Sequence, residues 1–176
     1  MTKKAQIATV WLDGCSGCHM SFLDIDQRLI AIAEKATLVY SPLVDIKEFP
    51  TDVDVTLVEG AVSSVEDLEK IKKVRARTKI LVSLGDCAVT SNVPSMRNPF
   101  GVAAVCRRAY LEDTVNPKVP SQVVPALLPE ARPIHEFVKV DVFVQGCPPS
   151  ADAIFETVSE ILEGRVPILA PHTKFG

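Results

Sequence analysis

Short apolar runs that alternate with segments of helical periodicity restrict the fold of this 176-residue chain more than any other feature. The runs cover residues 5–12, 37–41, 54–58, 79–84 and 138–144. Nearly continuous apolar runs of this length are typical of strands that are buried on both faces of a parallel sheet. Such strands joined by helices predict an α/β fold, specifically a flavodoxin-like, doubly wound parallel sheet with right-handed crossovers.

Helices are expected wherever apolar residues recur at helical spacing between these strands. They are predicted to begin near Ser21, Ser64 and Ser150. Ser21 with Asp24 has the spacing of a capping box, and Ser64 with Asp67 marks the next helix start. The last helix is expected to stop at Gly164, because glycine commonly ends helices.

The composition favours one ordered globular domain spanning residues 1–176, since a chain of this length can bury a single core. Hydrophobic residues make up 47% and charged residues 23%, which argues against intrinsic disorder. The net charge of −3 offers no basic surface for nucleic acid. No apolar segment approaches the roughly 18 residues that a membrane span needs, and the N-terminus lacks a secretory pattern. We therefore expect a cytoplasmic protein.

Residues 94–133 interrupt the alternation and hold seven of the 13 prolines. A long segment without clear periodicity is commonly either disordered or functional. This one also contains Phe100, Tyr110 and several valines and leucines. We therefore expect an ordered, proline-rich insertion before the last strand that packs on a partner protein.

Four of the five cysteines follow the ends of expected strands. Cys15 and Cys18 follow the first strand as a Cys-x-x-Cys pair, Cys87 follows the fourth strand and Cys147 the fifth. Because the carboxyl ends of parallel strands share one edge of a sheet, where ligands bind, the four thiols are predicted to meet there. Cys106 lies away from any strand end and is expected to serve packing.

Four cysteine thiolates can hold either zinc or an iron–sulfur cluster. Structural zinc usually lies between two close cysteine pairs, whereas this chain has one pair and two single cysteines. A [4Fe-4S] cluster, whose irons are reached from several directions, fits better, and Cys147-Pro148 is similar to the ending of ferredoxin cluster motifs. Helix N-termini at Ser21 and Ser150 are expected to offset the negative charge of such a cluster.

Three other interpretations stay open at this point. Cys-x-x-Cys alone is also the motif of a thioredoxin-like redox pair, which leaves Cys87 and Cys147 unexplained. Single free cysteines are commonly buried for packing. A flavodoxin-like fold can bind flavin, although the loop after the first strand has two cysteines instead of a hydroxyl-rich phosphate-binding run.

Other residues near these loops carry weaker signals. Trp11 is expected in the core. His19 could contact a cluster or relay protons, but a capping or surface role fits as well, so no function is assigned to it. Glu59 ends the third strand on the same edge and is expected either to contact the site or a partner, or to be solvated. Arg107 and Arg108 are expected on a solvated face.

At these loops the chain resembles the small, electron-transferring subunit of [NiFe]-hydrogenases. WLDGCSGC, SLGDCA and VQGCPPS are similar to the three cluster loops of that family, in the same order, and VEGAV is similar to its third strand exit. The resemblance spans nearly the whole chain. It implies that Cys15, Cys18, Cys87 and Cys147 hold the proximal [4Fe-4S] cluster.

Departures from the family narrow this expectation. Exported members carry a twin-arginine leader and a C-terminal extension with two further clusters, whereas this chain shows no leader and ends at Gly176, which implies one cluster. GCSGCHMSFLDID is similar to the cytoplasmic NAD(P)-reducing group, in which diaphorase iron–sulfur and flavin subunits receive the electrons. The cluster-bearing subunit of NADH:quinone oxidoreductase is a relative, but it has adjacent cysteines in its first loop.

The resemblance thus implies the electron-transfer small subunit of a cytoplasmic NAD(P)-linked [NiFe]-hydrogenase, which catalyses H2 + NAD+ = NADH + H+ only with its large subunit. It implies a Ni-Fe centre, FMN and NAD(P) on partner subunits, and no catalytic residue on this chain. Related modules that deliver electrons to ferredoxin, a deazaflavin or quinone are one alternative. A zinc-stabilised interaction domain without a redox role is the other.

Overall fold

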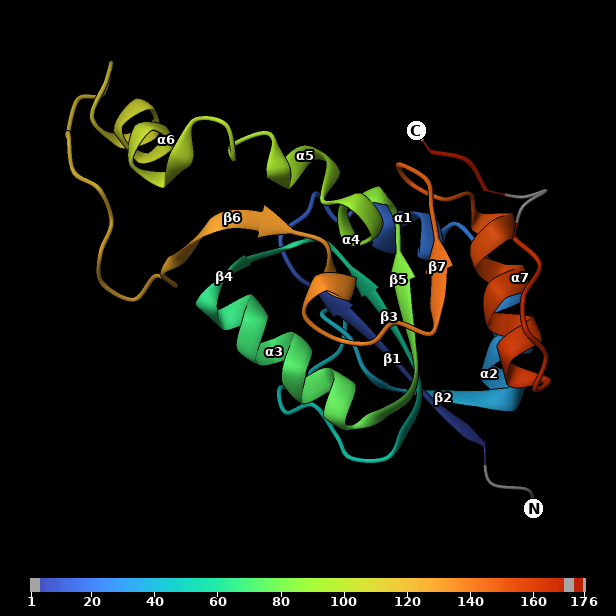
Figure 1. Ribbon diagram of the computed structural model, residues 1–176. Coiled ribbons are helices and arrows are strands. Elements are labelled where there is room, and N and C mark those ends of the chain that lie inside the picture. Colours follow the sequence, from blue (N-terminus) through green and yellow to red (C-terminus); the bar gives the residue numbers. More distant parts are fainter. Residues whose placement is uncertain (1–3, 170–172, 176) are drawn as a thin grey trace.

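A five-stranded parallel sheet in the order β2-β1-β3-β5-β7 is the centre of the computed structural model (Figure 1), which describes residues 4–169 and 173–175. The strands are β1 (Ala5–Trp11), β2 (Ala36–Tyr40), β3 (Val53–Glu59), β5 (Thr78–Leu84) and β7 (Val142–Val144). Renumbered by appearance in this sheet, the order is 2-1-3-4-5, that of flavodoxin-like folds. The predicted fold class is confirmed.

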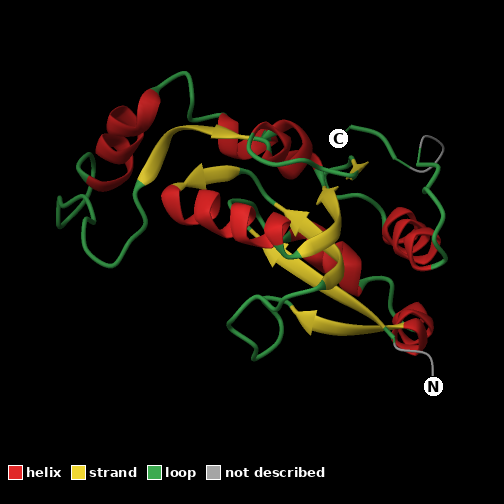
Figure 2. Ribbon diagram, turned by 60° about the horizontal axis from the view of Figure 1, so that its bottom comes forward, coloured by secondary structure: helices red, strands yellow, loops and turns green. Residues whose placement is uncertain are grey.

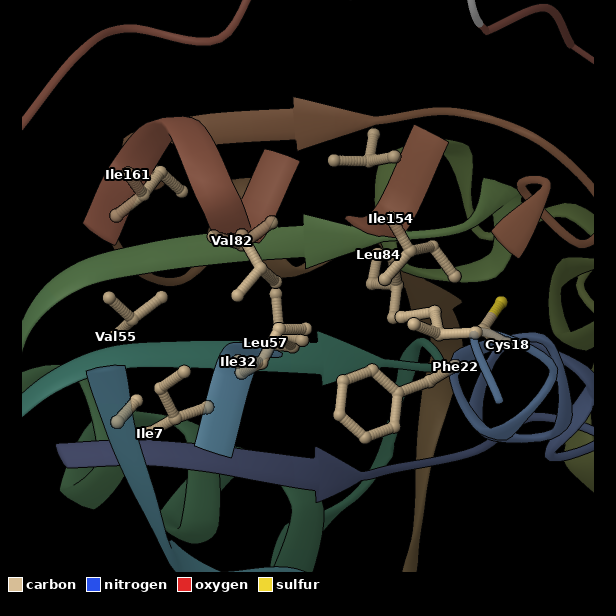
Figure 3. Close-up of a cluster of buried hydrophobic side chains, with 14 residues drawn as sticks. Ile7, Cys18, Phe22, Ile32, Val55, Leu57, Val82, Leu84, Ile154 and Ile161 are labelled. Carbon is tan, nitrogen blue, oxygen red and sulfur yellow. The ribbon is translucent and has the colours of Figure 1, made fainter. Parts of the chain in front are cut away.

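Helices cover both faces of the sheet (Figure 1). On one face lie α1 (Gly17–Leu23), α2 (Arg28–Lys35) and α7 (Ala151–Leu162), and on the other lie α3 (Val65–Ala76) and α4 (Asp86–Thr90). Neighbouring residues of a strand point to opposite faces of the sheet. Leu57 packs in the core under α1, α2 and α7, shown in Figure 3, and Val58 packs in the core under α3 and α4. Burial on both faces explains why the strands are apolar throughout.

Two helices begin where the sequence predicts. At the start of α3, the Ser64 hydroxyl accepts the Asp67 N–H at 3.1 Å, and the Asp67 carboxylate accepts the Ser64 N–H at 3.0 Å. At the start of α7, the Ser150 hydroxyl accepts the Ala153 N–H at 3.2 Å. Both caps satisfy backbone donors that have no acceptor within the helix.

The predicted helix start at Ser21 is wrong. α1 begins at Gly17, so Ser21 lies within it, and the Ser21 hydroxyl donates to Pro149 O at 2.5 Å instead of capping a helix. Asp26 takes a positive φ of 56° and separates α1 from α2, where one helix was expected. A short turn over residues 24–27 therefore divides an apolar pattern that is continuous in the sequence.

The last strand of the sheet is shorter than the predicted run of residues 138–144. Only Val142–Val144 pairs with β5. Just before it, the Asp141 carboxylate accepts the Leu81 N–H at 2.9 Å and is paired with Arg75 at 2.6 Å. The Asp141 side chain thus accepts the Leu81 N–H in place of a backbone carbonyl of a longer strand.

Residues 94–133 contain α6 (Gly101–Tyr110) and β6 (Leu127–Arg132), which lie away from the main sheet in both views (Figure 1, Figure 2). β6 pairs with the short β4 (Val62–Ser64), while residues 111–126 form neither helix nor strand. α5 (Asn92–Ser95) leads into this segment, and the 3-10 helix η1 (Ile134–Glu136) follows it. None of the α6 residues, all of which the structure describes, is buried.

Membrane crossing needs a long apolar helix. Among the helices formed by residues 4–169 and 173–175, none has the required length and apolar character.

Replacing Ser64 by alanine should lower the free energy of unfolding by about 1 kcal/mol, because the Asp67 N–H loses its acceptor. Equilibrium urea denaturation of the full chain without air measures the change. Ser121→Ala, in the exposed stretch of residues 111–126, is the control and should leave the free energy unchanged. Equal stabilities of the two variants would contradict the role assigned to the cap.

Candidate metal centre

The strands that precede the cysteines end in one row across the sheet. Trp11 of β1 pairs with Glu59 of β3, Glu59 pairs with Leu84 of β5, and Leu84 pairs with Val144 of β7. The chain then turns within three or four residues to a cysteine after β1, β5 and β7. The structure therefore brings the three cysteine loops to one edge, as the sequence predicts (Figure 1).

The four cysteines differ in exposure. Cys18, in the first turn of α1, and Cys87, in α4, are buried, whereas Cys15 and Cys147 are exposed. All five cysteines are free thiols, and Cys106 is partly buried on α6, apart from the others. Within residues 4–169 and 173–175, no three histidine, cysteine, aspartate or glutamate side chains are grouped as a site for a single metal ion.

Burial and the negative charge of neighbouring groups make two of the four thiols harder to ionise. Burial raises the pKa of Cys18, and negative charge on nearby groups, including the other three thiols, adds to the increase. Burial also raises the pKa of Cys87 to about 11, although a hydrogen bond from the Val93 N–H works in the opposite direction. Since the thiolate is the metal ligand, such thiols need a cation to ionise together. The chemistry of these donors therefore fits a positively charged metal group.

Glycine allows the end of β5 to lie against the Cys18 thiol. Gly85 has a φ of 81°, and a Cβ atom there would lie 2.2 Å from Cys18 Sγ. Only glycine fits this position without displacing the thiol. In Figure 3, Cys18 lies at the end of the core toward which the strand arrows point, beside Phe22 and Leu84.

A buried carboxylate connects the two loops that carry single cysteines. Asp86, which is 3% exposed, accepts the Gly146 N–H at 2.7 Å, and the Asp86 N–H donates to Gly146 O at 2.9 Å. Cys87 and Cys147 directly follow these two residues. Sequence reasoning missed Asp86, and its position next to a cysteine was the only available signal.

Glu59 and His19 are buried next to the loop that carries the cysteine pair. Glu59 is 1% exposed and His19 is 5% exposed, so the solvated and surface interpretations of these residues are wrong. Glu59 Oε2 lies 2.5 Å from His19 Nδ1 and also accepts the His19 N–H at 2.9 Å. The other expectation for Glu59, contact with the site or with a partner, stays a prediction, and these two bonds join Glu59 to the residue that follows Cys18.

Three other residues can be compared with expectation. Trp11 is 45% exposed, so its predicted place in the core is wrong: it is the last residue of β1, at the edge where the loops begin. Arg107 and Arg108 are exposed on α6, as expected.

Comparison with known proteins agrees with this geometry. Residues 15–161 match the family described as NADH ubiquinone oxidoreductase, 20 Kd subunit. The delta subunit of the NAD-reducing hydrogenase HoxS of Cupriavidus necator is 42% identical over 168 residues, which cover 92% of this chain and 80% of the relative. One of the subunits of the F420-non-reducing hydrogenase of Methanothermobacter marburgensis is 37% identical over 171 residues, and this chain spans only 55% of its length.

Solved structures show the same relationship. A chain in the crystal structure of an NAD+-reducing [NiFe]-hydrogenase in the H2-reduced state matches with a TM-score of 0.94 and 38% identity, covering 99% of this chain and 100% of that one. The Dm. baculatum [NiFeSe]-hydrogenase, at 19% identity and a TM-score of 0.59, shares the fold. From the match over residues 15–161 and these identities, the chain belongs to the family of the 20 kDa subunit of NADH:ubiquinone oxidoreductase, in the group of [NiFe]-hydrogenase small subunits.

Proposed function

We propose that this chain is the electron-transfer small subunit of a cytoplasmic NAD(P)-linked [NiFe]-hydrogenase, with Cys15, Cys18, Cys87 and Cys147 as the ligands of one [4Fe-4S] cluster. The observation that carries the proposal is the convergence of these thiols from three strand-end loops at one sheet edge. When bound, the cluster supplies one-electron transfer. Residues 1–176 act as one iron–sulfur domain in this proposal.

The contribution of this chain is to hold the group and to set its surroundings. Two ligands are buried and two are exposed, so a group held by all four connects the protein interior with its surface. Hydrogen bonds to sulfur and the apolar surroundings tune the reduction potential of such groups. The Gly17 N–H at 3.4 Å from Cys15 Sγ and Asn92 Nδ2 at 3.5 Å from Cys147 Sγ are donors of this kind.

The proposal also specifies which molecule accepts the electrons. NAD(P) is supported by the 42% identity with a subunit of an NAD-reducing hydrogenase and by the TM-score of 0.94 with a chain of an NAD+-reducing enzyme. The 37% identity with a subunit of an F420-non-reducing hydrogenase supports a second candidate, a related module with another acceptor. In the NAD(P) proposal, diaphorase subunits carry FMN and the nucleotide.

The large subunit, which carries the Ni-Fe centre in this proposal, needs a docking surface near the cysteines. Three apolar residues in and just after α5 are exposed, Val93 at 59%, Met96 at 68% and Phe100 at 72%, and we call these three residues the α5 patch. It continues the cysteine edge, because Val93 and its neighbour Asn92 bond to Cys87 and Cys147. Exposed apolar patches commonly mark protein interfaces, so we place the large-subunit contact here and on the proline-rich segment 94–133.

Metal analysis of the complex purified without air tests the proposed cofactor. Iron and acid-labile sulfide on this chain, with visible absorption that dithionite bleaches, are the expected result. A colourless chain that contains zinc and no iron would contradict the electron-transfer function and support the zinc-stabilised interaction domain.

Replacing Cys87 by serine should remove or distort the cluster and reduce hydrogen-dependent NAD(P) reduction by more than the roughly 10- to 100-fold that loss of an outer partner causes. Iron content and the reduction rate of the complex are the measurements. Cys106→Ser is the matched control for iron content, because Cys106 lies apart from the other cysteines on α6, and this variant should keep its iron. Full activity of Cys87→Ser would show that the ligand assignment is wrong.

Replacing Phe100 by glutamate should weaken binding of the large subunit by about 2 kcal/mol or more, as loss of a central aromatic contact commonly does. Co-purification and a binding titration measure the effect, and the iron content of this chain should not change. Ile30→Glu is the control, because Ile30 is 67% exposed on α2, outside the α5 patch. Equal binding by both variants would rule out the α5 patch as the contact.

A further inference from the structure

We propose that Glu59 is a positioning residue for the cysteine pair: it caps α1 from a neighbouring strand and fixes both ends of the loop that holds Cys15 and Cys18. The inference rests on the proposed iron–sulfur function. Glu59 is not itself a ligand in this proposal. It acts on the cysteine pair through its bonds to His19.

α1 has no cap of its own. Ser16, the residue before the helix, has a φ of 67° and makes no side-chain capping bond. The first N–H groups of a helix have no acceptor within the helix, and a side chain next to the helix start usually accepts one. Here Glu59 Oε2, from the end of β3, accepts the His19 N–H at 2.9 Å. The carboxylate thus replaces the missing N-cap from 40 residues away along the chain.

The same carboxylate oxygen also holds the His19 ring. Nδ1 lies 2.5 Å from Glu59 Oε2, and the two side chains are only 7% and 2% exposed. A short bond to a carboxylate, shielded from water, is stronger than a neutral bond at the surface. His19 Nε2 has no hydrogen-bond partner among the residues that the structure describes, so the ring is held through Nδ1. Since His19 directly follows Cys18, two bonds to His19 fix the backbone of that cysteine.

Glu59 also fixes the other end of the loop. Its carbonyl oxygen accepts the Leu12 N–H at 2.9 Å, just before the loop begins. A Cβ atom at Gly14 would lie 3.5 Å from Glu59 Oε1 and 3.3 Å from Gly60 Cα, so the backbone beside Cys15 lies directly against Glu59. One residue therefore contacts the loop ahead of Cys15 and behind Cys18.

Packing alone does not explain an acid at this position. Burying a carboxylate costs free energy unless hydrogen bonds satisfy it, and an apolar side chain of the same size would avoid that cost. The two hydrogen bonds to His19 are what only an acceptor at residue 59 can provide.

Three variants of the full chain, each purified in its complex without air, separate a role of Glu59 in packing from its role as hydrogen-bond acceptor for His19. Glu59→Met fills the volume without an acceptor, Glu59→Gln keeps one acceptor oxygen, and Thr56→Val is the control. Thr56 is fully buried on the same strand and bonds to Thr78 at 2.8 Å. The readouts are the rate of iron loss to a chelator, the EPR spectrum of the dithionite-reduced chain, its midpoint potential and the melting temperature.

Glu59→Met should lose iron about 10- to 100-fold faster than the unmodified chain, as variants that lack an outer partner of a ligand commonly do. Glu59→Gln should lose iron more slowly than Glu59→Met, with an altered EPR spectrum and a shifted midpoint potential, because a neutral amide oxygen accepts the two bonds from His19 more weakly than a carboxylate does. Thr56→Val should lower the melting temperature only.

The results that overturn the inference are distinct from those that overturn the function. Identical iron loss in Glu59→Met and Glu59→Gln would mean that Glu59 only fills space. If Glu59→Met does not fold, an unchanged spectrum and potential in Glu59→Gln still overturns the positioning role. An unmodified chain without iron and sulfide would overturn the proposed function itself.

Discussion

The alignment of strand ends in one row is the constraint on which the rest of the structure depends. Trp11, Glu59, Leu84 and Val144 pair across the sheet as the last residues of their strands. Parallel pairing fixes this row through backbone hydrogen bonds, and the apolar side chains on both faces fix the register, since a one-residue slip would exchange the two faces. The positions of the cysteine loops are therefore consequences of the packed sheet rather than of the loops themselves.

Two buried carboxylates hold the cysteine loops in the positions that the sheet gives them. Each cysteine loop is held by a carboxylate that lies beneath it: Glu59 binds the loop of the cysteine pair, and Asp86 joins the loops of the two single cysteines. Both carboxylates are almost fully buried, and both accept backbone N–H groups that the sheet and helices leave unpaired. Burial and then the negative charge of Glu59 raise the pKa of Cys18, so in the proposed function a positively charged metal group balances the charge of the site.

The fold class and the convergence of the cysteines follow from short-range patterns in the sequence. Apolar runs mark the strands because both faces of the sheet are covered, and the cysteines follow these runs directly. The helix start at Ser21 was wrong because the cap of α1 comes from Glu59, which no local pattern connects to Gly17. Burial of His19 was missed for the same reason. The shortened β7 depends on a side chain, Asp141, taking a backbone role, and residue spacing does not reveal that exchange.

The pairing of Asp86 with Gly146 also bears on how the protein is made. These residues are 60 positions apart, and the loop of Cys147 takes its place only when β7 joins β5 near the end of the chain. Contacts between such distant segments form late in folding, because the intervening chain must first be ordered. A growing polypeptide on the ribosome therefore lacks the complete set of four thiols until residue 147 has emerged, and in the proposed function the cluster is inserted only after that point.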